Sequence, residues 1–261
     1  MTRLILLLSV CLLSCGQQMT KQKQQQAAEP SIDSSSYVFT GTKAALDDMF
    51  QSNRDSVEFR AEDRWTSLFV GHLFSKEDKD AVLRYKDNDT VANVIVLRQK
   101  GEHWDTIFSA RYYPHTGAMS ADFIQVEDFN GDNIPDLKVV KNYWDFHTGE
   151  SSDLWLYGKE HFTKVVGFDS IVSAAYDKRT NLIYSYQSMG CADMVMYFGI
   201  FRIIGNKVEK VKEMSCDCCT ELMDSCSIKV FGQASYKVPY KTAYKHVPGF
   251  YAEGVKVKCG L

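Results

Sequence analysis

Residues 128–137 read Asp128-Phe129-Asn130-Gly131-Asp132-Asn133-Ile134-Pro135-Asp136-Leu137. Side chains that carry oxygen recur in this stretch at loop positions 1, 3, 5 and 9. The residues before it, Phe-Ile-Gln-Val at 123–126, and those that end it, Leu-Lys-Val-Val at 137–140, are largely apolar and β-branched, which favours strands. The stretch therefore predicts a tight turn between two antiparallel β-strands.

The oxygen atoms of this turn match the ligands of calcium, a hard ion that takes six to eight of them. The predicted ligands are Asp128, Asn130, Asp132, the backbone carbonyl of Ile134, and Asp136. Asn133 stands at loop position 6, where the backbone turns with positive φ, and asparagine tolerates that conformation well. Three carboxylates so close together would also repel one another without a cation. We expect a structural calcium ion here; the alternative is an Asp- and Asn-rich turn without a metal.

Short apolar or alternating runs separated by turn residues continue along the chain, and this pattern is typical of strands. The expected strands are 65–74, 81–85, 91–97, 104–113, 123–126, 137–143, 154–157, 182–186, 195–204, 208–211 and 228–231. A helix is expected at 43–51, where Leu46, Met49 and Phe50 share one face. The predicted fold is all-β and mainly antiparallel, with one short N-terminal helix. A propeller, a sandwich and a barrel all suit such a series of strands, and no repeat of uniform length selects among them.

The first residues have the pattern of a secretory signal, because Arg3 precedes an apolar run at 4–10 that is too short to span a bilayer. Leu12-Leu13-Ser14-Cys15 resembles a bacterial lipobox, in which the cysteine is diacylated and becomes the new N-terminus. The alternative is an ordinary signal peptide with an incidental cysteine. We expect residues 1–14 to be a lipoprotein signal peptide and Cys15 to be the lipidation site.

Residues 16–36 contain little that could be buried, so we expect the lipidated segment 15–36 to be a disordered tether. The remaining residues, 37–261, have the length of one large β domain. Gly16 is not the aspartate that resembles an inner-membrane retention signal, which favours the outer membrane, on its periplasmic or its surface face. The expected location is the bacterial cell envelope, with the lipid anchor in the membrane.

Six of the eight cysteines remain when Cys11 and Cys15 are set aside. They are Cys191, Cys216, Cys218, Cys219, Cys226 and Cys259. An even number in an exported chain favours disulfides, and the adjacent Cys218 and Cys219 need separate partners. A zinc cluster built from 216–219 and Cys226 is the alternative, but the spacing lacks paired C-x-x-C knuckles.

Charge and motifs exclude several functions. The net charge is −3, and no Lys/Arg cluster dominates any segment, so a nucleic-acid partner is not expected. The six histidines form no H-E-x-x-H pattern, and no G-x-S-x-G elbow occurs. We expect a protein that is not an enzyme; the alternative is a catalytic site assembled from distant strands. Aromatic pairs at 112–113 and 143–144, together with Trp155, give a modest case for a glycan- or protein-binding surface.

The loop at 128–137 is similar to the D-x-N-G-D-G-x-x-D-L loop of FG-GAP and VCBS-type repeats, which are β-propeller blades of extracellular proteins. With Asp-Leu-Trp-Leu-Tyr at 153–157, His-Phe at 161–162 and Asn-Leu-Ile-Tyr-Ser at 181–185, the chain resembles a narrower group. That group consists of calcium-containing, propeller-like periplasmic lipoproteins that inhibit lysozyme-like peptidoglycan hydrolases or give immunity against them. The resemblance covers about 65–215 and implies a propeller-like, calcium-binding domain over 37–261; Asn133 in place of glycine and the cysteine-rich tail depart from it.

Three functions follow as hypotheses. The first is a calcium-stabilised, non-catalytic binding lipoprotein that acts as an inhibitor or immunity protein against a lysozyme-like hydrolase. The second is an envelope lipoprotein that binds or hydrolyses glycans. The third is a purely structural envelope protein.

Overall fold

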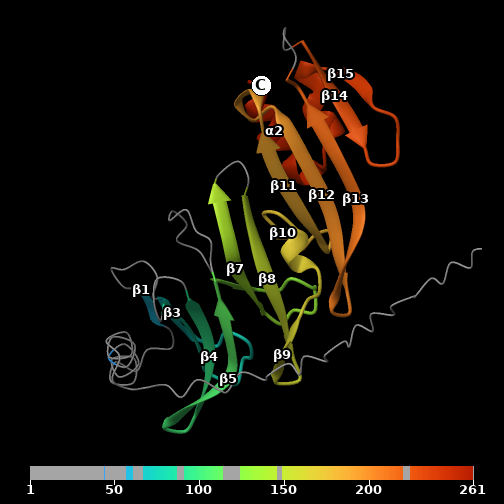
Figure 1. Ribbon diagram of the computed structural model, residues 1–261. Coiled ribbons are helices and arrows are strands. Elements are labelled where there is room, and N and C mark those ends of the chain that lie inside the picture. The colour runs from blue at the N-terminus through green and yellow to red at the C-terminus, as the bar shows by residue number, and fades with distance from the viewer. Residues whose placement is uncertain are drawn as a thin grey trace, which may run out of the picture. The chain divides into compact units, whose positions relative to one another are not determined.

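The strands of the computed structural model form three antiparallel sheets (Figure 1). The structure describes residues 44, 57–60, 67–86, 91–113, 124–145, 149–219 and 224–260. The prediction of a mainly antiparallel all-β fold is confirmed, and no closed propeller is found among the described residues. None of the described helices is long and apolar enough to cross a membrane.

Strands that follow one another along the chain are neighbours in each sheet. The first sheet contains β1 (Val57–Arg60), β2 (Ser67–Gly71), β3 (Asp80–Lys86), β4 (Ala92–Lys100) and β5 (His103–Tyr112). The second contains β6 (Ile124–Glu127), β7 (Asp136–Asp145), β8 (Gly149–Gly158) and β9 (His161–Lys164). The third contains β10 (Ala175–Asp177), β11 (Leu182–Met189), β12 (Val195–Ile204), β13 (Lys207–Asp217), β14 (Ser225–Val230) and β15 (Tyr236–Pro239).

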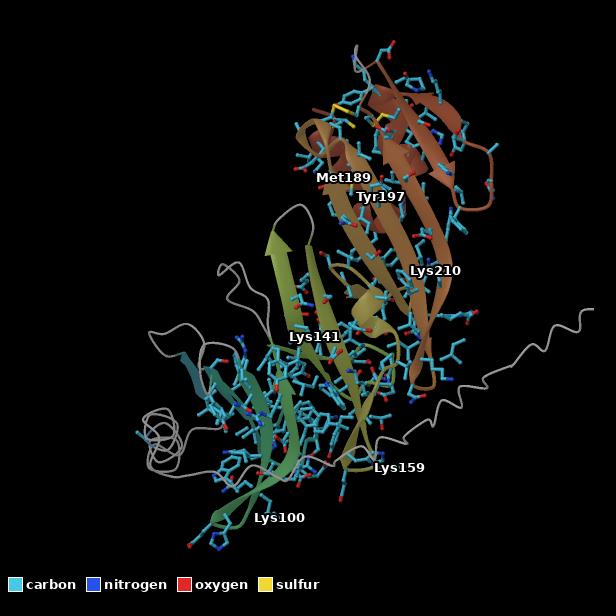
Figure 2. All side chains as sticks on the ribbon, viewed as in Figure 1. Lys100, Lys141, Lys159, Met189, Tyr197 and Lys210 are labelled. Atoms are coloured by element: carbon cyan, nitrogen blue, oxygen red, sulfur yellow. A yellow bond between two sulfur atoms is a disulfide. The ribbon has the colours of Figure 1, made fainter. Side chains whose placement is uncertain are left out.

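Each sheet contains a meander of four strands whose last two strands are joined by a tight hairpin. Lys100 and Lys159 mark two of these hairpins in Figure 2. Two-residue hairpin turns need positive φ at the first central position, and type I′ turns need it at both. Lys159 and Glu160 adopt φ values of 51° and 64°, and Gly101 and Gly205 adopt 61° and 62°. The three sheets are therefore variations on one antiparallel unit.

Buried side chains join each sheet to its successor. One cluster packs Phe74, Val82, Val94 and Val96 of the first sheet region against Leu137, Val139 and Tyr157 of the second. Another packs Phe129 and Leu154 of the second sheet region against Phe168, Ile171, Ile183 and Phe201. A third, around Met196, Phe198, Cys216 and Ile228, is covered by Val247, Val255 and Cys259 of the C-terminal segment.

That C-terminal segment is helical, which the strand pattern did not predict. It consists of the 3-10 helices η3 (Tyr240–His246) and η4 (Gly249–Tyr251), followed by α2 (Ala252–Lys258). Two further 3-10 helices are η1 (Phe168–Ser170) and η2 (Cys191–Asp193). The helix predicted at 43–51 lies outside the described residues, apart from Ala44, which is helical.

Candidate metal centre

The loop at 128–135 connects β6 to β7, whose ends Glu127 and Asp136 are paired. The antiparallel hairpin predicted from the flanking residues is thus confirmed. All five predicted ligands lie within this one connection or at its end. The loop ends next to β8, because Leu137 of β7 pairs with Trp155.

Asp128 organises the first half of the loop. Its carboxylate accepts hydrogen bonds from the backbone N–H groups of Asn130 at 3.1 Å and Gly131 at 2.6 Å through Oδ1. Its Oδ2 accepts one from Asn133 at 2.9 Å. The side chain is buried. Asp128 therefore holds the turn closed around its own carboxylate, as short acidic side chains do in turns.

Asn130 and Asp132 organise the second half, and they are more exposed than Asp128. Asn130 Oδ1 accepts the N–H of Asp132 at 2.9 Å, and Asn130 Nδ2 donates to Asp132 Oδ2 at 3.0 Å. Asp132 Oδ1 accepts the N–H of Ile134 at 2.8 Å. Asp132 is exposed and Asn130 is partly exposed, so this half of the loop forms its solvent-accessible rim.

Asp136 is the fully buried acid of the loop. Its Oδ2 accepts the N–H of Phe129 at 2.9 Å, and its Oδ1 accepts the N–H of Tyr157 at 3.0 Å. Burial raises the pKa of Asp136 to about 7, and the two backbone N–H groups oppose that rise. The charges of Asp132 and Asp128 add to it. Among the described residues no lysine or arginine pairs with Asp136.

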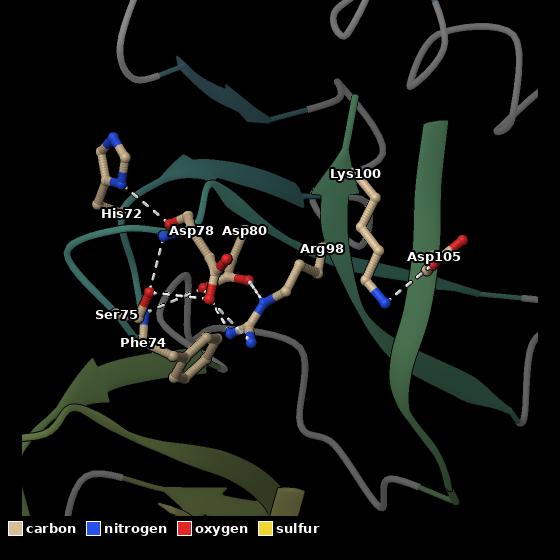
Figure 3. Close-up of polar contacts among 8 residues, drawn as sticks. All are labelled: His72, Phe74, Ser75, Asp78, Asp80, Arg98, Lys100 and Asp105. Atoms are coloured by element: carbon tan, nitrogen blue, oxygen red, sulfur yellow. Dashed lines mark hydrogen bonds and ion pairs between the residues drawn. The ribbon is translucent and has the colours of Figure 1, made fainter. Parts of the chain in front are cut away.

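The first sheet has a similar buried acid, and that acid has a cation (Figure 3). Asp80 begins β3 as Asp136 begins β7, and its Oδ2 accepts the N–H of Phe74 at 3.3 Å. The Nε of Arg98 donates to Asp80 Oδ1 at 2.8 Å, and Arg98 Nη1 lies 3.1 Å from Asp78 Oδ2. In both sheets a buried aspartate thus accepts backbone N–H groups of a loop, but among the described residues only the aspartate of the first sheet is paired with a cation.

The backbone at Asn133 matches the prediction for loop position 6, since its φ is 65°. Gly131 also has positive φ, at 82°, and it lies against the third sheet. A Cβ atom there would lie 2.8 Å from Asn181 Oδ1 and 3.0 Å from the Tyr176 hydroxyl. Tyr176 donates to Asn181 Oδ1 at 2.9 Å. These two contacts of the loop were missed from the sequence, because nothing local links residues so far apart in the chain.

Gly131→Ala is expected to destabilise the protein by about 2–4 kcal/mol, because a methyl group there is both strained and overpacked. Gly101→Ala is the matched control, since Gly101 has φ of 61° and nothing within 4 Å of its Cβ position. Its expected cost is about 1 kcal/mol, from backbone strain alone. Urea unfolding of both variants in chelator measures the difference. Equal losses would mean that the contact with Asn181 and Tyr176 is unimportant.

The loop carboxylates are farther apart than the ligands of a compact metal site. Such a site would have all its ligand atoms within 4.8 Å of one another, and among the described acidic, histidine and cysteine residues only Cys216, Cys218 and Cys226 meet this condition. Asp128, Asp132 and Asp136 do not form such a group. To share one ion, their carboxylates would have to draw together and exchange some of the loop's internal hydrogen bonds.

Four of the six candidate cysteines form two disulfides, at the end of the third sheet where Figure 2 draws sulfur atoms. Cys191 is bonded to Cys219, and Cys218 to Cys226. The adjacent pair at 218–219 therefore has separate partners, as predicted. Cys216 and Cys259 are free and buried. The predicted lipidation site, Cys15, lies outside the described residues.

The two residues of the aromatic pair at 112–113, where β5 ends, differ in exposure. Tyr112 is buried and accepts a hydrogen bond from Trp155 Nε1 at 3.0 Å, whereas Tyr113 is 68% exposed. The side chains at 143–144 lie outside the described residues. Trp155 packs edge-on against Phe108, with ring centroids 4.8 Å apart. Tyr112 and Trp155 thus belong to the core contact between the first two sheets.

No family model matches the chain, and no curated protein matches it. Among solved structures, one similar chain is described as "Structure of a Xanthomonas Type IV Secretion System related protein". The two chains are 13% identical, and the similarity covers 70% of this chain and 92% of that one, with a TM-score of 0.40. These values are too low to transfer a fold or a function.

Proposed function

We propose that this chain is a calcium-binding, lipid-anchored protein of the bacterial cell envelope that acts by binding a partner and not by catalysis. One observation carries the calcium part of the proposal: Asp136 is a fully buried acid beside two further carboxylates, without a described cationic partner. A buried carboxylate is costly unless it is paired. Asp80 meets this requirement with Arg98, and a calcium ion would meet it at Asp136.

The chemistry of the loop supports calcium over other cations. Its side chains offer hard oxygen donors, which calcium prefers, and no nitrogen or sulfur ligand. Asp128, Asn130, Asp132 and Asp136 would contribute side-chain oxygens, and Ile134 its backbone carbonyl. When bound, the ion would supply positive charge that neutralises the three carboxylates, and its role would be structural.

A propeller-like arrangement is the finer proposal for the fold. It is supported by three successive sheets, each built on a four-stranded antiparallel meander, the unit from which propeller blades are made. In this proposal the calcium loop stabilises the second blade. Through Gly131 the loop also contacts the third sheet, so the ion would strengthen the contact between neighbouring blades.

Calcium is expected to stabilise the wild-type protein by about 2.7 kcal/mol at a hundredfold excess over its dissociation constant, or roughly 5–10 °C in melting temperature. Asp132→Ala should abolish this response, because it removes a ligand from the exposed rim. Asp105→Ala is the matched control, since Asp105 is exposed and pairs only with Lys100 on the surface among its described contacts. Thermal unfolding with calcium and with chelator provides the measurement. A wild-type protein whose melting temperature ignores calcium would refute the calcium site.

For the partner, we propose a lysozyme-like peptidoglycan hydrolase, on the resemblance of the loop and its neighbouring strands to the inhibitor and immunity lipoproteins. The test measures turnover of peptidoglycan by lysozyme-type enzymes with and without the purified protein, in calcium and in chelator. Inhibition in calcium that weakens in chelator or in Asp132→Ala is expected. No inhibition and no binding across a panel of such enzymes would overturn the proposed partner and leave the calcium site untouched.

A further inference from the structure

Four sulfur-bearing side chains converge in the core between the third sheet and the C-terminal segment. They are Cys216, Cys218, Cys226 and Cys259, and all four are buried in one apolar cluster. Cys191 and Cys219, the remaining two cysteines of the described part, are bonded to each other. Among the described cysteines, the four clustered ones can therefore pair only with one another.

Two of these four are already joined. Cys218 follows β13 and Cys226 lies in β14, and their Cα atoms are 4.1 Å apart. Cys216 precedes Cys218 by two residues, and its Sγ lies 3.6 Å from the Sγ of Cys218. Cys216 thus lies directly beside a disulfide as a thiol, which leaves Cys259 as the other thiol of the cluster.

Cys259 closes the helix α2, and its N–H bonds to the carbonyl of Val255 at 2.9 Å. The turn before it is fixed by Tyr240, whose hydroxyl donates to the carbonyl of Lys258 at 3.4 Å. Burial raises the pKa of the Cys216 thiol to about 12, and negative charge on Cys259 contributes to the rise. Both thiols are buried in the same apolar cluster.

We propose that Cys216 and Cys259 are an oxidation site and form a third disulfide, which fastens α2 to β13. The oxidant is a protein or small-molecule disulfide of an oxidising compartment. The two thiols lose two electrons and two protons as the Sγ–Sγ bond forms, and the oxidant is reduced to two thiols. The bond closes a loop of about 40 residues, which constrains the unfolded chain strongly.

The bond has a structural consequence for the cover of the third sheet. The C-terminal segment contributes Val247 and Val255 to the core around Met196 and Phe198. It also stacks Phe250 on Tyr184, with ring centroids 4.6 Å apart. A covalent bond at Cys259 holds this cover in place from its end. In the reduced protein, the same cover is held by this packing and by hydrogen bonds, such as the one from the N–H of Tyr240 to the carbonyl of Asp224 at 3.0 Å.

The test counts thiols in the full chain after reduction and re-oxidation with oxidised glutathione, by alkylation under denaturing conditions. Among the six cysteines of the described part, the third bond predicts no free thiol in the wild type and one in Cys216→Ala or Cys259→Ala. Peptide mapping without reduction should identify the 216–259 pair. Two alkylated thiols at 216 and 259 in the re-oxidised wild type would overturn the proposal. So would a mapped 216–226 pair with 218–259, which exchange at the neighbouring sulfur of Cys218 would produce.

Thermal unfolding gives a second measurement, which does not depend on alkylation of the thiols. Each single alanine variant is expected to lower the melting temperature by roughly 10 °C, by loss of the cross-link. The double variant should lose about as much as either single one, because the bond can be lost only once. Additive losses would indicate two independent buried thiols and overturn the proposal. None of these outcomes depends on calcium, so they leave the proposed function unaffected.

Discussion

Replacing Arg98 with methionine is expected to lower the free energy of unfolding by about 3–5 kcal/mol, because a buried carboxylate then loses its counterion. The guanidinium of Arg98 lies 2.8 Å from Asp80 Oδ1, and the two side chains are 6% and 0% exposed. Arg98 also lies over the ring of Tyr157, 5.4 Å from its centroid. Denaturant unfolding of the variant and the wild type at pH 7 gives the loss.

Arg202→Met is the matched control for this experiment. Arg202 pairs with Glu209 at 3.0 Å, but both side chains are about half exposed, so the expected loss is below about 1 kcal/mol. Adding Asp80→Asn to Arg98→Met should recover part of the stability, because the orphaned charge is removed while an oxygen remains for the N–H of Phe74. Equal losses in Arg98→Met and Arg202→Met would contradict the claim that the buried charge dominates.

The apolar strands could be predicted from the sequence because their pattern is local. The predicted strand 195–204 coincides with β12, and the strands predicted on both sides of the acidic loop lie within one to two residues of β6 and β7. Such segments are short runs rich in apolar, β-branched or aromatic residues and bounded by turns, a pattern that favours strands. No partner is needed to recognise it.

Polar strands could not be predicted in this way. The first half of β8 has polar side chains, of which Ser151, Ser152 and Asp153 are buried. Groups of neighbouring strands contact two of them: Asn142 of β7 donates to Ser151 Oγ at 3.2 Å, and Lys164 Nζ of β9 lies 2.8 Å from Asp153 Oδ2. The predicted strand therefore began only at 154. Likewise β13 extends six residues beyond the predicted 208–211, since its solvent-facing Lys and Glu side chains conceal the strand.

At the candidate metal centre, too, features set by consecutive residues could be predicted, whereas contacts between residues far apart in sequence could not. The loop, its turn and the left-handed Asn133 are encoded in consecutive residues, and they could be predicted. The contacts with Tyr176 and Asn181, and the cation that Arg98 gives to Asp80, join residues far apart in sequence. The pairing of cysteines is also non-local, because it depends on which strands are neighbours.

Without calcium, the protein is expected to lose stability as the pH rises from about 4 to about 7. The pKa of Asp136 is raised to about 7 in the folded protein, chiefly by burial, from a normal value of 3.8. Between these values the folded state holds a proton that the unfolded state has released, so protonation favours folding. That contribution is complete below the unfolded pKa and disappears as the pH passes through about 7. At 1.36 kcal/mol per pKa unit, it amounts to about 4 kcal/mol at most.

Calcium should remove this loss, because the ion takes over the neutralising role of the proton once Asp136 is ionised. The measurement is the melting temperature between pH 4 and 8 in saturating calcium and in chelator. The two curves should coincide near pH 4, where protons compete with the ion, and diverge up to neutral pH. Groups outside the loop, such as Asp177 with its lowered pKa beside Arg179, affect both curves equally, so the difference isolates the loop. In Asp132→Ala the divergence should vanish, and parallel curves in the wild type would mean that Asp136 titrates independently of any bound ion.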